Sequence, residues 1–155
     1  MKMQPGRDLK AVFVTVLRVA VGWHFLYEGV SKLLQKGWTA SGYLANATGP
    51  LADVYHSLAA SPGLLKVVDL LNMYGLTAIG LALSVGILVR SASAAGALML
   101  ALYYFAYPPF GASLAMHNQP GVFIVNAQFC EAAVLLVFVF LRDSGYGLHR
   151  LLPGL

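Results

Sequence analysis

Several side chains that can carry charge or move protons lie within one long apolar segment, residues 9–34. They are Arg18, His24, Glu28 and Lys32. At about 100° per residue of α-helix, these positions fall within an arc of roughly 120°. In lipid, each such group must face protein, an opposite charge or water. Histidine exchanges protons near neutral pH, so His24 and Glu28, one helical turn apart, are the candidate catalytic residues.

Two later apolar segments add polar groups at helical spacing. Asp69 and Asn72 are three residues apart in one segment, and so are Gln128 and Glu131 in the other. With Arg18, these four form the candidate cofactor-binding set. Counting helix rise from the segment ends places Arg18 and Glu131 at similar depth. The sequence therefore predicts an ion pair between Arg18 and Glu131.

The same residues also have structural explanations. The Arg18–Glu131 pair can serve only to fix helix packing. Glu28 and Lys32 are in the favoured i, i+4 order for a helical ion pair, and Lys32 can extend outward to the membrane surface. His24 can be a buried histidine with satisfied hydrogen bonds. Both the functional and the structural interpretation stay open for each residue.

Composition places much of the chain in lipid. Its 155 residues are 59% hydrophobic and 10% charged, whereas soluble domains carry about 25% charged residues. The net charge is +4 with scattered Lys and Arg, which does not favour a nucleic-acid partner. Cys130 is the single cysteine, so neither an internal disulfide nor a CxxC redox pair can form.

Helix length sets the expected architecture. The segments long enough to cross a bilayer are 9–34, 64–89, 92–110 and 122–141. They predict an all-α fold, a four-helix integral membrane bundle in a single domain, 1–155. Arg90–Ser91 is expected to join the middle two helices, and Pro108–Pro109 to end the third.

The loops suggest an orientation and a surface helix. Lys and Arg are more numerous on the side of both termini, which predicts cytoplasmic termini. The outer loop from Pro108 to Gly121, with His117, is either a connector or a docking surface. In the first outer loop, a short amphipathic helix is expected at the membrane interface, with its apolar positions at Leu51, Val54, Tyr55 and Leu58.

Metal and haem sites are not expected. A haem held by two histidines needs a second imidazole at the depth of His24, but His56, His117 and His149 fall in loops or the tail. The chain also lacks HExxH and CxxC spacings, a glycine-rich phosphate loop and a nucleophile elbow.

Two stretches carry a family resemblance. Residues 17–33, LRVAVGWHFLYEGVSKL, and the last helix with Asn126 and Glu131 followed by GYGLHRLL resemble the opening and ending of DoxX/DoxD-like membrane proteins. His149 departs from the aspartate expected in the closing motif. The resemblance implies a four-helix protein of a bacterial or archaeal cytoplasmic (inner) membrane, similar to the membrane subunit of thiosulfate:quinone oxidoreductase.

The resemblance and the polar residues together suggest a function. The leading hypothesis is a membrane subunit of a quinone-linked oxidoreductase, with quinone held among the first, second and fourth helices. Electrons would come from an outer-facing donor or redox partner protein. One alternative is a non-catalytic anchor or assembly subunit for such a partner. Another is a small-solute carrier built as a homodimer, which the small-residue helix faces would permit.

Overall fold

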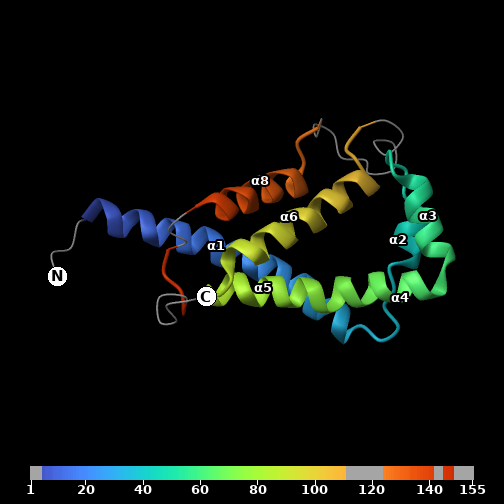
Figure 1. Ribbon diagram of the computed structural model, residues 1–155, viewed down its shortest axis with the longest axis horizontal. Coiled ribbons are helices and arrows are strands. Elements are labelled where there is room, and N and C mark those ends of the chain that lie inside the picture. The colour runs from blue at the N-terminus through green and yellow to red at the C-terminus, as the bar shows by residue number, and fades with distance from the viewer. Residues whose placement is uncertain (1–4, 111–123, 142–144, 149–155) are drawn as a thin grey trace.

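A computed structural model describes residues 5–110, 124–141 and 145–148. These residues form helices and no strand (Figure 1). In chain order the helices are α1 (Pro5–Leu34), α2 (Ser41–Ala45), α3 (Ala52–Ala60), α4 (Pro62–Leu70), the π-helical segment η1 (Leu71–Gly75), α5 (Leu76–Val85), α6 (Val89–Ala106) and α8 (Ala127–Phe140).

Within the described residues, three helices are long and apolar enough to cross a membrane. They cover Leu9–Leu34, Pro62–Val85 and Val89–Ala106. The second is one continuous rod made of α4, η1 and α5 (Figure 1). The expected fourth span is shorter than predicted: α8 has 14 residues, which cover about 21 Å against a hydrocarbon core of ~30 Å. Residues 122 and 123 lie outside the described part.

The turn between the middle helices is not at Arg90–Ser91, as the sequence suggested. Gly86 ends α5 in the left-handed conformation at φ 80°, and Leu88 follows at φ 49°. Glycine adopts this conformation without steric cost, so the chain turns at residues 86–88. Arg90 therefore lies in the first turn of α6 rather than in a loop. At its other end α6 stops at Ala106, before Pro108–Pro109, as predicted.

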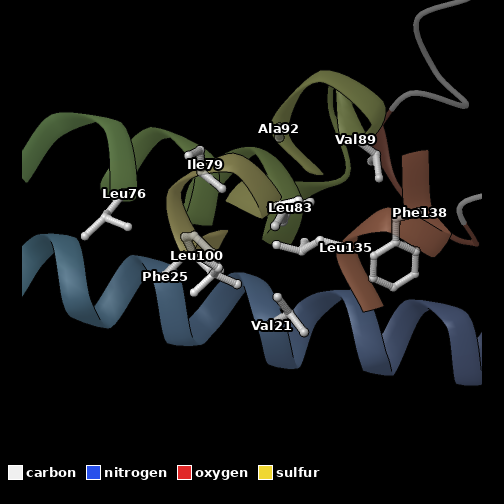
Figure 2. Close-up of a cluster of buried hydrophobic side chains, with 11 residues drawn as sticks. Val21, Phe25, Leu76, Ile79, Leu83, Val89, Ala92, Leu100, Leu135 and Phe138 are labelled. Carbon is white, nitrogen blue, oxygen red and sulfur yellow. The ribbon is translucent and has the colours of Figure 1, made fainter. Parts of the chain in front are cut away.

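The long helices and α8 share a hydrophobic core, and a second, smaller cluster lies under α2 and α3. α1 packs along α5, and α6 packs against both α5 and α8. Figure 2 shows side chains from all four helices meeting there, including Val21 from α1, Leu83 from α5, Leu100 from α6 and Leu135 from α8. We call the end near residues 86–88 the turn end, and the opposite end, where α2 and α3 lie, the cap end.

Small residues bring α1 and α5 into backbone contact. A Cβ atom added at Gly80 would overlap the backbone of Leu26, and one added at Gly29 would overlap Thr77. Close backbone approach through small residues is a main source of helix association in lipid, where tails are as apolar as leucine. These contacts set the register of α1 against α5.

A cap made of α2 and α3 crosses one end of the long helices (Figure 1). The backbone N–H groups of Thr48 and Gly49 donate to the carbonyl of Ala106, at 3.1 and 3.0 Å. The Tyr55 hydroxyl donates to the carbonyl of Leu102 at 2.8 Å. Carbonyls at the end of a helix lack partners within it, so the cap satisfies the last turn of α6.

The amphipathic helix expected over 51–58 is present as α3, but its apolar stripe is divided. Tyr55 is buried, while Leu51 and Val54 are exposed. The surface of α3 that faces away from the core carries Asp53 and His56. This helix therefore covers the ends of the long helices, and its exposed side carries both polar and apolar side chains.

The α1–α5 contact can be tested with two glycines. Gly80→Ala should lower the free energy of unfolding by roughly 1–3 kcal/mol, because the new methyl group overlaps Leu26. Gly63→Ala is the matched control, since nothing lies within 4 Å of its Cβ position. Thermal unfolding in detergent measures both. Equal melting temperatures for Gly80→Ala and the unaltered protein would contradict the contact.

Candidate functional site

A close contact between His24 and Glu131 links α1 to α8, about two-thirds of the way along α1. His24 Nδ1 lies 2.5 Å from Glu131 Oε1. The His24 side chain is 55% exposed and that of Glu131 is 19% exposed. The imidazole also makes an edge contact with Phe25, whose ring is part of the core. A titratable pair thus lies at the side of the helices, between apolar segments, with much of its imidazole uncovered.

The first turn of α8 fixes the carboxylate. Asn126 caps this helix, because its Oδ1 accepts a hydrogen bond from Phe129 N at 2.9 Å. Asn126 Nδ2 in turn donates to Gln128 Oε1 at 2.6 Å. Gln128 precedes Glu131 by three residues, so both lie on one face of α8. Gln128, one of the candidate residues named from the sequence, therefore lies on the same face of α8 as Glu131.

Arg18 does not pair with Glu131, contrary to the sequence expectation. Its side chain is 1% exposed and donates to the carbonyl of Tyr146. The guanidinium also lies against Gly86, which the backbone of Gly147 approaches as well. Depth explains the error: α1 extends past the turn end (Figure 1), so Arg18 lies at the level of the turn rather than at that of Glu131. Arg18 connects α1, the turn and the chain after α8.

Glu28 and Lys32 form the predicted i, i+4 pair. Lys32 Nζ lies 2.5 Å from Glu28 Oε2. The ammonium group is also 5.7 Å from the centre of the Trp38 ring, a distance at which a cation is attracted to an aromatic face. The Glu28 side chain is 46% exposed. This pair lies one to two turns from His24, toward the cap end.

Asp69 and Asn72 have structural partners. Asp69 Oδ1 accepts a hydrogen bond from Ala40 N at 2.8 Å, which ties the start of α2 to α4. Asn72 Nδ2 donates to Val68 O at 2.9 Å, and its Oδ1 accepts from the Tyr103 hydroxyl. Within the described residues, His24 and Glu131 bond to each other rather than to Asp69 or Asn72. Their predicted role in orienting a head group gains no support from this geometry.

A group of contacting tyrosines at the cap end was not predicted from the sequence. Tyr43 donates to the carbonyl of Tyr103 at 3.3 Å, and Tyr107 donates to the carbonyl of Tyr43 at 2.7 Å. The Tyr43 and Tyr107 rings lie 4.7 Å apart. Burial, and then the neighbouring Tyr103, Tyr107 and Tyr55, raise the pKa of Tyr43. Burial also raises the pKa of Tyr55.

An open apolar groove of about 380 Å³ lies along α8, lined by Ala133, Leu136, Val137, Phe140 and Leu141. These positions are on the opposite face of α8 from Glu131 by helical spacing. The groove is therefore separate from the ion pair.

Some sequence predictions concern residues outside the described part. His117 lies in the undescribed range 111–123, and His149 lies in 149–155. Within the described ranges, no three His, Cys, Asp or Glu side chains gather as metal ligands would. No protein-family model, curated protein or solved structure matches this chain.

A double-mutant cycle tests the corrected pairing. His24→Ala and Glu131→Ala should show a coupling energy of about 0.5–3 kcal/mol, because the two side chains are in contact. Arg18→Ala and Glu131→Ala should instead be additive within about 0.5 kcal/mol. Unfolding by denaturing detergent in mixed micelles measures the three single and two double variants. Strong coupling in the Arg18 cycle and none in the His24 cycle would contradict the structure.

The raised pKa values of Tyr43 and Tyr55 predict that the cap formed by α2 and α3 unfolds at alkaline pH. A phenol whose pKa is raised by the fold, as at Tyr43 and Tyr55, stays protonated in the folded state, while the unfolded state ionises near pH 10. Its stabilising contribution is therefore complete below about pH 10 and is lost as pH rises through the folded pKa. Proteolysis within residues 35–61 should accelerate above about pH 10, and Tyr43→Phe should reduce that acceleration. Tyr74→Phe, at an exposed position, should leave it unchanged.

Proposed function

We propose that this chain is a DoxX-like integral membrane protein of four membrane helices, with α8 as the fourth and with its cap end facing outward. In this proposal it is the membrane subunit of a quinone-linked oxidoreductase in a bacterial or archaeal cytoplasmic membrane. The three long apolar helices support the membrane location. α8 supports the fourth crossing because it runs beside α6: Tyr104 donates to Ile124 O at 2.8 Å near one end, and Gly96 meets Leu135 further along.

The half-exposed His24–Glu131 pair is the observation that carries the function. Ionisable groups inside a bilayer are costly unless something polar covers them. A membrane quinone suits this position, because it combines a flat apolar ring with two carbonyl oxygens that accept hydrogen bonds. It would reach the uncovered imidazole sideways from the lipid.

The residues present fit the proton chemistry of a quinone substrate. Reduction of quinone to quinol consumes two electrons and two protons. The electrons would come from an outer-facing small reductant or a partner redox protein. The imidazole of His24 can donate a proton to a carbonyl oxygen, and the carboxylate of Glu131 stabilises the imidazolium form before that transfer. Gln128 is the nearest further candidate for contact with the ring substituents.

The observed pair also suits the alternative of a non-catalytic anchor, because His24 and Glu131 satisfy each other by direct contact. In that case the pair only fastens α8 to α1. Ligand binding separates the two functions, since a fastening pair has no reason to recognise quinone.

Quinone binding should be measured on purified protein in lipid nanodiscs by titration with decylubiquinone. His24→Gln should weaken binding by about tenfold or more, which equals 1.4 kcal/mol or more. The matched control is His56→Gln, because His56 contacts Ala47 O in the cap and should bind normally. Saturable binding that His24→Gln weakens supports the proposal. No binding by the unaltered protein, or equal binding by both variants, favours the anchor.

A further inference from the structure

The second membrane-spanning rod is interrupted by a π-helical turn, η1, between α4 and α5. Proline is a usual cause of irregularity inside a helix, but the first proline after Pro62 is Pro108. π-Helical turns are rare and occur frequently at functional sites. Such a turn holds one residue more than the α-helix around it, so it rotates the two flanking helices relative to each other by about 100°.

Side chains bind the backbone at both ends of η1. Asn72 Nδ2 donates to Val68 O at 2.9 Å, and the Thr77 hydroxyl donates to Met73 O at 2.7 Å. The other polar atom of the Asn72 side chain, Oδ1, accepts a hydrogen bond from the Tyr103 hydroxyl. Tyr103 belongs to α6, so this tertiary contact holds the π-helical turn in its present form.

The two sides of η1 differ in how firmly they are held. α5 is locked against α1, because Gly80 receives the backbone of Leu26. In the described structure α4 contains no buried residue, and its partly buried apolar side chains, Leu65 and Val68, pack against the cap. A change of register in η1 must therefore rotate α4, which is attached to the cap, rather than α5 (Figure 1).

The present register brings Asp69 to the cap. Asp69 lies eight residues before Thr77, and a regular α-helix would place the two about 80° apart. The extra residue in η1 reduces this angle to about 20°. In this position Asp69 Oδ1 accepts a hydrogen bond from Ala40 N, at the start of α2, at 2.8 Å. A regular α-helix over 71–75 would turn Asp69 away from Ala40 and break this bond.

We propose that η1 is a switch with two registers that attaches or releases the cap. In the π-helical register, Asp69 fastens α2 to α4. In the α-helical register, α4 rotates, Asp69 leaves Ala40, and the cap separates from the ends of the long helices. The Tyr103 hydroxyl holds the π-helical register, so a ligand that accepts a hydrogen bond from this hydroxyl would release the cap. The switch rests on none of the proposed quinone chemistry.

Hydrogen exchange of residues 38–47, measured in lipid nanodiscs without ligand, tests the attachment. Tyr103→Phe removes only the hydroxyl, while the carbonyl that accepts from Tyr43 remains. This variant should accelerate exchange about tenfold or more, because the N–H group of Ala40 loses its partner. Tyr104→Phe is the matched control, since it removes the neighbouring hydroxyl and should leave exchange unchanged. Unaltered exchange in Tyr103→Phe would overturn the proposal.

A deletion separates a switch from simple packing. Tyr74 is an exposed residue of η1, and its deletion removes the extra residue while Asp69 and Thr77 keep their present directions. Exchange in the cap should stay slow in this variant. Adding Tyr103→Phe should no longer accelerate it, because no second register remains. A hydroxyl that only packs α6 against η1 would accelerate exchange with or without the deletion, and that result contradicts the switch.

The control deletion is Ala78, which lies in the regular helix α5. Its loss should prevent folding, because it breaks the close packing of α5 on α1. If deletion of Tyr74 also prevents folding, spin labels placed singly over 64–70 in a Cys130→Ser background measure the register directly. Tyr103→Phe should shift the accessibility profile of α4 by one residue. An unshifted profile overturns the proposal.

Discussion

Backbone contact between α1 and α5 fixes the depth of every polar group on α1. Gly80 receives the backbone of Leu26, and Gly29 receives Thr77, so α1 cannot slide along α5 without steric overlap. In this register Arg18 reaches the turn at Gly86, and Lys32 reaches the cap at Trp38. His24 is then left between them, facing α8. The arrangement of charges along α1 is a consequence of where two glycines permit close packing.

The contacts that each polar side chain makes show which residues hold the fold together and which are candidates for function. Asp69 and Asn72 have their hydrogen-bonding atoms engaged by the cap and by Tyr103, and both hold the cap end together. Arg18 is buried and joins three segments at the turn end. In the described part of the chain, the His24–Glu131 pair joins two helices while its imidazole stays 55% exposed between apolar segments. In lipid, that combination is what a binding site for a polar head group requires.

Periodicity and length predicted the apolar helices, the surface helix α3 and the Glu28–Lys32 pair, because each depends on residues close in sequence. The partner of Glu131 could not be predicted in this way. Counting rise from segment ends assumes that all helices start at one plane, whereas α1 extends beyond the turn (Figure 1). The turn was misplaced for a related reason: Arg90 was assigned to a loop because it is charged, although Gly86 supplies the conformation that ends α5. The tyrosine contacts at the cap depend on tertiary packing and leave no periodic pattern.

The geometry of the pair couples the chemistry of its two members. His24 meets Glu131 through Nδ1, so Nε2 can donate a hydrogen bond to a ligand while the link between α1 and α8 stays in place. Once the imidazolium has given its Nε2 proton to a substrate, the Glu131 carboxylate faces a neutral imidazole beside an apolar core. Loss of the neighbouring positive charge makes uptake of a new proton by the pair more favourable. Proton donation to a ligand and proton uptake by the pair are therefore expected to be coupled, which suits a substrate whose reduction consumes protons.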